Sequence, residues 1–100
     1  MITEIADIKI RPEQRTEFLS AIHRAAQTVL CKANGYVSHQ ILPCVESPGR
    51  VVLIVNWQTL EDHTVGFRES AAFADWRAII GPYFAQPPHV EHFQTSLPKG

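Results

Sequence analysis

The most informative part of the sequence is residues 50–77, RVVLIVNWQTLEDHTVGFRESAAFADWR. They begin with the run VVLIV at residues 51–55, whose apolar side chains on both alternating faces predict a strand that is covered on both sides. This strand ends at Trp57. Thr59 and Asp62 follow at the three-residue spacing at which a hydroxyl and a carboxylate cap a helix N-terminus. A helix is therefore predicted directly after the strand, with Trp57 at the junction.

The helical region after Trp57 contains a weak point at Gly66, and Ser70 can cap a new start. We therefore predict a short helix over residues 60–67 and a longer one over residues 71–80. Aromatic and titratable side chains gather here beside one strand end, which is a natural position for a ligand pocket. These side chains belong to His63, Phe67, Phe73, Trp76 and Arg77.

The remaining segments supply three more strands and a long helix. Alternating polarity predicts a first strand with one apolar face, and helical spacing of apolar residues predicts the helix, which Pro12 begins and Gly35 follows. A tight turn over residues 47–50 joins the second and third strands as a hairpin. The predicted strands span residues 2–10, 36–45 and 89–96, and the predicted helix spans residues 12–32.

The element order β-α-β-β-α-β predicts an α+β fold of the ferredoxin-like type, with one antiparallel sheet and both helices on one face. One hundred residues are expected to form a single domain over residues 1–100, with a frayed tail at 97–100. The other sheet face is left bare, although the third strand is apolar on both sides. We therefore predict a homodimer in which two sheets pack face to face, as a dimeric α/β barrel.

Composition excludes several classes of function. The net charge of −1 and the lack of charged blocks argue against nucleic acid and anionic membranes as partners. No apolar run approaches the roughly 20 residues of a membrane helix, and the N-terminus does not resemble a signal peptide. Cys31 and Cys44 fall in different elements and are expected to be buried free thiols. We expect a cytoplasmic protein.

The order Trp57, capped turn, then Phe67, Ser70 and Phe73 as F-x-x-S-x-x-F resembles the antibiotic biosynthesis monooxygenase family. The proline-rich linker and the final aromatic strand, PPHVEHF at residues 87–93, fit the same family. The resemblance covers nearly the whole chain. It implies a dimeric α/β barrel with a pocket between the sheet and the helices of each subunit.

The anthrone-oxidising branch of that family works without metal or flavin, so the resemblance implies that no cofactor is needed. Trp57 matches the strand-end tryptophan of this branch, and Arg77 matches its arginine on the long helix. Two positions depart from the branch: Leu53 replaces an expected asparagine, and His63 replaces an expected tyrosine.

Other branches match less well. The haem-degrading branch needs a histidine ligand where this chain has Arg77, a tryptophan where it has Phe67, and an asparagine near Ile5. Because arginine stays protonated and cannot ligate iron, haem degradation is disfavoured. The quinol-oxidising and signal-isomerising relatives carry a histidine at the position of Phe67, although His63 lies one helical turn earlier.

Three residues are the candidate catalytic groups. His63 is a candidate general base, because the pKa of histidine lies near neutrality, and the alternative is a solvated surface histidine. Arg77 would stabilise a substrate oxyanion, or else pair with Glu61, Glu69 or Asp75; Arg68, beside Glu69, is the weaker candidate. The Trp57 N–H would point at a ligand oxygen, or else Trp57 fills the core.

The predicted substrate-binding residues are Leu53, Val55, Phe67, Phe73, Trp76, His39 and His92. No metal site is expected, since His89 and His92 on one strand point to opposite faces. The leading hypothesis is a cofactor-independent monooxygenase that oxidises an electron-rich aromatic, an anthrone or quinol, with O2. The alternative is a non-catalytic, dimeric small-molecule-binding module of the same fold.

Overall fold

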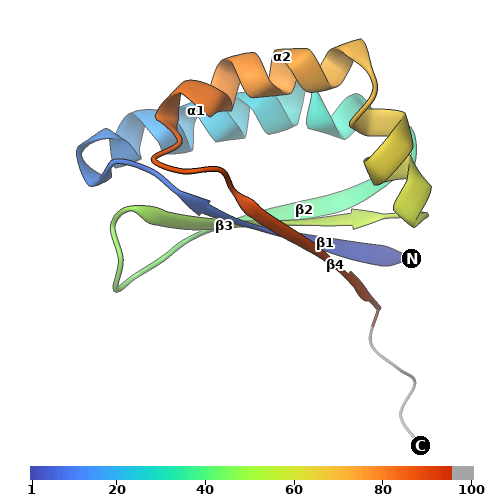
Figure 1. Ribbon diagram of the computed structural model, residues 1–100, viewed down its shortest axis with the longest axis horizontal. Helices are drawn as coiled ribbons and strands as arrows, with labels where there is room; N and C mark the ends of the chain where they lie inside the picture. The colour runs from blue at the N-terminus through green and yellow to red at the C-terminus, as the bar shows by residue number, and fades with distance from the viewer. Residues whose placement is uncertain (96–100) are drawn as a thin grey trace, which may run out of the picture.

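The computed structural model describes residues 1–95, which form a four-stranded antiparallel sheet with two helices across one face (Figure 1). The strands lie in the order β2-β3-β1-β4, so the predicted ferredoxin-like α+β fold is confirmed. The predicted tail at 97–100 and the end of the last strand at Ser96 lie outside the described residues. In chain order the elements are β1 (Ile2–Lys9), η1 (Pro12–Gln14), α1 (Arg15–Thr28), η2 (Leu30–Lys32), β2 (Tyr36–Pro43), β3 (Arg50–Trp57), η3 (Asp62–Phe67), α2 (Ala71–Ile80), η4 (Gly81–Tyr83) and β4 (His89–Gln94).

The central strand β1 sets the register of the sheet. It pairs antiparallel with β3, Ile2 lying opposite Trp57, and with β4, Glu4 lying opposite His92. Because side chains alternate along a strand, the even-numbered residues of β1 and the odd-numbered residues of β3 share the face that the helices cover. The core forms there, and its most deeply buried side chains include Ile8, Phe18, Ile22, Val51, Val55 and Trp57.

The predicted first helix is divided in the structure. A short 3-10 turn precedes α1 and another follows it, so only the middle of the predicted range is α-helical. Gly35 lies just beyond with a φ of 82°, the left-handed conformation that glycine adopts without steric cost. Within residues 1–95, neither helix combines the length and apolar character that crossing a bilayer requires.

The predicted helix after Trp57 is present, but η3 is a π-helix rather than an α-helix. Its start is the predicted capping box: the Asp62 N–H donates to Thr59 Oγ1, and the Thr59 N–H donates to Asp62 Oδ2, both at 3.1 Å. The N–H of Arg68 donates to the carbonyl of His63 at 3.0 Å, so Arg68 lies one wide turn above His63. Ser70 caps α2 by accepting from the N–H of Phe73.

The outer face of the sheet is not covered by the helices (Figure 1). Ile5 lies opposite Ile54 on this face, and Phe93 is 47% exposed. The same face carries an ion pair, in which Arg50 donates to both carboxylate oxygens of Asp7 at 3.0 and 2.8 Å. One chain therefore buries only one face of β3. The cover that the sequence predicts for the other face would have to come from a partner chain.

Candidate active site

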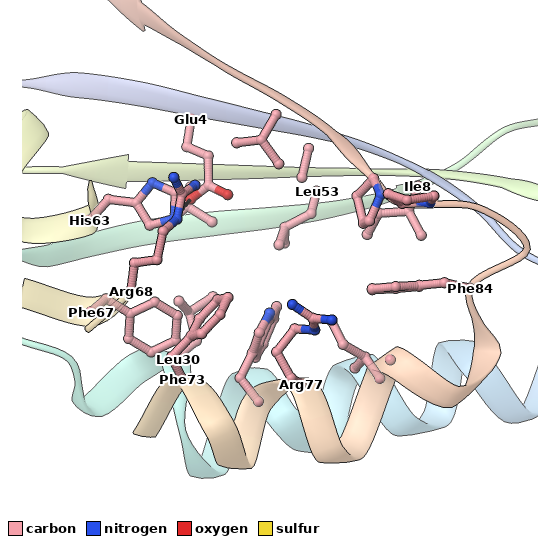
Figure 2. A pocket seen from close by; sticks show the side chains of 18 of the residues that line it. Glu4, Ile8, Leu30, Leu53, His63, Phe67, Arg68, Phe73, Arg77 and Phe84 are labelled. Carbon is pink, nitrogen blue, oxygen red and sulfur yellow. Dashed lines mark ion pairs between the residues drawn. The ribbon is translucent and has the colours of Figure 1, made fainter. Parts of the chain in front are cut away.

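A cavity of about 600 Å³ lies between the inner face of the sheet and the η3–α2 region (Figure 2). Strands β1, β3 and β4 form one wall, and η3, α2 and the segment at residues 84–88 form the other. Its volume is in the range of small-molecule sites. The structure brings together at this cavity the predicted residues Leu53, Val55, His63, Phe67, Phe73, Trp76 and Arg77.

The aromatic residues of η3 and α2 pack edge to face along the helical wall. The Phe67 ring centroid lies 5.6 Å from that of Phe73 and 6.3 Å from that of Trp76, at interplanar angles of 87° and 74°. Edge-to-face packing of this kind holds rings in fixed orientations. The wall therefore offers a rigid aromatic surface to a flat ligand.

Trp57 does not line the cavity, and its predicted contact with a ligand is wrong. The indole is fully buried, and its Nε1–H donates to Glu4 Oε1 at 3.0 Å. A donor committed to a buried carboxylate is not available to substrate. Trp57 is therefore a core residue, the alternative considered from the sequence, and it also fixes the position of Glu4.

His39 and His92 are also absent from the cavity lining. The Nδ1 atom of His39 lies 2.6 Å from the Tyr36 hydroxyl, so His39 belongs to a separate polar contact on β2. The Nε2 atom of His92 lies 2.7 Å from Nδ1 of His63. His92 therefore contacts His63 rather than the cavity.

Glu4 is the residue that the sequence prediction missed. It projects from the inner face of β1, is 6% exposed and lines the cavity. Its Oε1 accepts the hydrogen bond from Trp57 and lies 3.4 Å from His63 Nε2, whereas its Oε2 has no hydrogen-bond partner among residues 1–95. Burial raises the pKa of the Glu4 carboxyl, and the Trp57 hydrogen bond and the charge of Arg68 oppose that rise. The ionised carboxylate is thus a stronger base than an ordinary glutamate.

His63 is buried beside Glu4, so the alternative of a solvated surface histidine is wrong. Its ring is 4% exposed and stacks on Trp57 at a centroid distance of 5.2 Å. Burial, with the positive charges of Arg68 and His92, lowers the pKa of His63 to about 4. At neutral pH the ring is therefore neutral and carries one N–H.

One tautomer of His63 satisfies both of its neighbours. An ionised Glu4 can only accept, so the His63 proton belongs on Nε2, which faces Oε1. The His63 Nδ1 then accepts from Nε2–H of His92. The two rings and the carboxylate form one row of contacts, a hydrogen bond between the rings and a 3.4 Å approach of His63 Nε2 to Glu4 Oε1, which ends at the half-buried His92.

Two arginines line the cavity at different places. Arg68 lies beside Glu4 and His63 (Figure 2), and its charge affects the pKa of both. Arg77 rises from α2 toward the sheet (Figure 2), with its Cζ 5.9 Å from the Phe73 ring centroid. Within residues 1–95 neither guanidinium forms an ion pair, so the alternative pairing of Arg77 with Glu61, Glu69 or Asp75 is not observed.

The sequence offers a signal for Glu4, which the prediction missed, but none for the position of Arg68, which it ranked below Arg77. Glu4 shares the parity of Ala6, Ile8 and Ile10, so an acid stands on an otherwise apolar strand face. From the sequence Arg68 is the weaker candidate, because it lies beside Glu69 on the predicted short helix. The π-turn aligns Arg68 with His63, and local sequence does not reveal that shift. Among residues 1–95, no group of three or more histidine, cysteine, aspartate or glutamate side chains is arranged to hold a metal ion.

Comparison with known proteins identifies the family. The family model for antibiotic biosynthesis monooxygenases matches residues 1–79. The chain belongs to the antibiotic biosynthesis monooxygenase family. It is 37% identical over 94 residues to the uncharacterized protein YczJ of Bacillus subtilis strain 168, an alignment that covers 94% of this chain and 98% of YczJ.

Solved structures of the antibiotic biosynthesis monooxygenase family share the fold. A Bordetella bronchiseptica protein named for this family superposes with a TM-score of 0.89 at 36% identity, covering 96% of this chain and 97% of that protein. SnoaB of Streptomyces nogalater, a cofactor-independent oxygenase, gives a TM-score of 0.80 at 17% identity, covering 98% of this chain and 97% of SnoaB. At that identity SnoaB shows the shared fold alone.

Proposed function

We propose that this chain is a cofactor-independent monooxygenase that oxidises an electron-rich aromatic, an anthrone or quinol, with O2. One observation carries the proposal: among residues 1–95 Glu4 Oε2 has no hydrogen-bond partner at a largely apolar cavity, while Oε1 accepts from Trp57 and lies 3.4 Å from His63 Nε2. A positioned carboxylate of raised pKa is suited to removing a weakly acidic proton. The family match and the named activity of SnoaB support the same class of reaction.

The first step we propose is proton removal by Glu4. Oε2 takes a proton from the substrate, either from an anthrone CH2 or from a quinol hydroxyl, and leaves a delocalised anion. Arg68, which lies beside Glu4 (Figure 2), stabilises the oxygen on which that charge gathers. Because the pKa of His63 is lowered to about 4, this residue is a weaker base than the ordinary histidine that the sequence analysis assumed. We therefore assign the base to Glu4 and make His63 its hydrogen-bond donor.

Dioxygen is the electron acceptor in the second step. The anthrone anion gives one electron to O2, and the resulting carbon radical and superoxide combine into a peroxide. The peroxide anion takes the proton back from Glu4, and loss of water from the resulting hydroperoxide gives the carbonyl product, so one O2 converts the CH2 group to C=O with release of one H2O. The protein supplies the dry aromatic wall of Phe67, Phe73 and Trp76, which keeps bulk water away from the anion.

His92 supports the base through His63. It is half-buried, and it contacts His63, which contacts Glu4. In the tautomer assigned above both rings direct an N–H toward Glu4, which favours the ionised carboxylate that the first step needs. We also propose that the active unit is a cytoplasmic homodimer joined through the outer faces of the two sheets.

The test is oxygen uptake with a panel of anthrones and quinols, corrected for oxidation without protein. Glu4→Gln keeps the acceptor for Trp57 but removes the base, and should lower the protein-dependent rate by at least about 100-fold. In the wild type the rate should fall as pH drops through the raised pKa of Glu4, because the carboxyl becomes protonated. Glu13→Gln, in the turn before α1, is the matched control. Normal turnover by Glu4→Gln would exclude Glu4 as the base.

The alternative is a binding module without turnover. Leu53 favours it, because an apolar side chain lines the cavity where the anthrone-oxidising branch has an asparagine. Saturable binding of an anthrone by the wild type, with no oxygen consumption across the panel, would support this alternative.

A further inference from the structure

The charges that line the cavity do not balance. Glu4 is the only carboxylate among its described lining residues, whereas Arg68 and Arg77 both contribute guanidinium groups. Neither arginine pairs with an acid within residues 1–95. Most of the remaining wall is aliphatic or aromatic. Both arginines are also exposed to solvent, so each can reach a charged group of a ligand in the cavity, and a neutral aromatic substrate would use neither charge.

The two cations serve different parts of the cavity. Arg68 contributes to the pKa shifts of Glu4, His63 and His92, whereas Arg77 contributes to none of these shifts. Arg77 instead extends along α2 toward its end, where its Nε lies 3.8 Å from the position that a Cβ on Gly81 would occupy. Figure 2 shows Arg77 between the Glu4–His63 end of the cavity and Phe84. Arg77 is therefore displaced from the proposed base.

We propose that Arg77 binds a permanent anionic group of the substrate, a carboxylate, on the side of the aromatic ring away from the reacting carbon. This rests in part on the proposed function, since it takes the Glu4 end as the reacting end. A guanidinium presents donors in a planar fork that matches a carboxylate, and the Phe73 ring at 5.9 Å helps to keep that fork in place. The substrate class is then an aromatic acid, and Arg77 determines specificity rather than stabilising the reacting oxygen.

Calorimetric binding of two matched probes tests this assignment without turnover. Anthraquinone-2-carboxylate and anthraquinone-2-carboxamide have the same ring and nearly the same size but differ in charge. The wild type should bind the carboxylate about tenfold or more tightly than the carboxamide. Arg77→Gln should remove that preference and leave carboxamide binding within about twofold of wild type.

Two further variants make the test specific. Arg24→Gln removes one positive charge from an exposed position on α1, outside the cavity lining, and should keep the preference. Arg68→Gln should weaken both probes alike and so also keep it. Equal binding of the probes by wild type, a preference that survives Arg77→Gln, or no binding of either probe at millimolar concentration would each overturn the proposal. Because the probes are not oxidised, a protein that prefers the carboxylate but never consumes O2 would retain this assignment and lose the oxygenase.

Discussion

At the scale of single residues, the site depends on what burial does to two titratable groups. Glu4 and His63 are both almost fully buried and lie 3.4 Å apart. Burial disfavours the charged form of each, so it raises the pKa of Glu4 and lowers that of His63 to about 4. The pair therefore carries at most the single charge of Glu4 near neutral pH, which is the charge that the proposed reaction needs.

The lowered pKa of His63 predicts a loss of stability in acid. The unfolded chain protonates this histidine below about pH 6.5, whereas the folded protein resists until about pH 4. Between those values the unfolded state binds more protons. The free energy of unfolding should therefore decrease as the pH is lowered from 6.5 to 4, by up to about 3 kcal/mol from this group. Glu4 has the opposite effect, since a raised pKa favours the folded state once the carboxyl is protonated.

Comparison with His63→Gln isolates the histidine contribution. Urea unfolding between pH 4 and 6.5 should show a shallower loss of stability in His63→Gln, because the histidine that takes up the proton is gone. Glu4, Arg68 and His92 still face the site in this variant, so their contributions remain. His23→Gln, at an exposed position on α1, should keep the wild-type profile. An unchanged slope in His63→Gln would show that burial of this ring does not control acid stability.

At the scale of elements, η3 is the segment that creates the site. Its π-helical turn places Arg68 one wide turn above His63, and π-turns occur frequently at functional sites. The loop before β2 supports it: the Gly35 carbonyl accepts from the N–H of Gln58 at 2.8 Å. A Cβ on Gly35 would overlap the carboxylate of Asp62, which is part of the cap of η3.

Gly35→Ala should therefore destabilise the protein by about 1–3 kcal/mol, from the strain of a positive φ and from displacement of Asp62. Gly66→Ala is the matched control inside η3, where an added Cβ meets nothing closer than 3.7 Å and alanine is the better helix former. Chemical denaturation of the two variants measures the contrast. Equal stability of the two variants would show that the Gly35–Asp62 approach is not needed to position η3.

At the scale of the whole molecule, the uncovered sheet face predicts assembly. Ile5, Val52 and Ile54 lie half-buried on this face, with Leu42 and Phe93 exposed around them. Because side chains alternate along β3, covering the second face of this strand would bury apolar surface that one chain leaves in water. A second copy of the chain is the partner that we propose.

Ile54→Arg should convert the dimer to monomers, because a charge at the centre of the paired faces would be buried without a partner. Sedimentation equilibrium measures the mass, and circular dichroism checks that the variant folds. Val65→Arg, at an exposed apolar position on η3, should remain dimeric. A wild-type protein that stays monomeric at all concentrations, or a dimeric Ile54→Arg, would exclude this interface.

Local sequence was enough to predict the order of the elements and the aromatic wall of the cavity. Local signals were sufficient for that: the capping box of Thr59 and Asp62, the Ser70 cap, Gly35 after the first helix, and the spacing of Phe67, Phe73 and Trp76. Each of these depends on residues a few positions apart. The family resemblance rested on the same local order, and the family match confirmed it.

Which groups meet at the site depends on contacts between distant segments of the chain. Glu4 and Trp57 are 53 positions apart, and they meet because β1 pairs antiparallel with β3 in one register, while β4 places His92 opposite Glu4. A shift of one residue would turn Glu4 to the outer face. Strand register follows from packing of distant segments and burial follows from the completed fold, so neither the partner of the Trp57 N–H nor the pKa shift of His63 is written in local sequence.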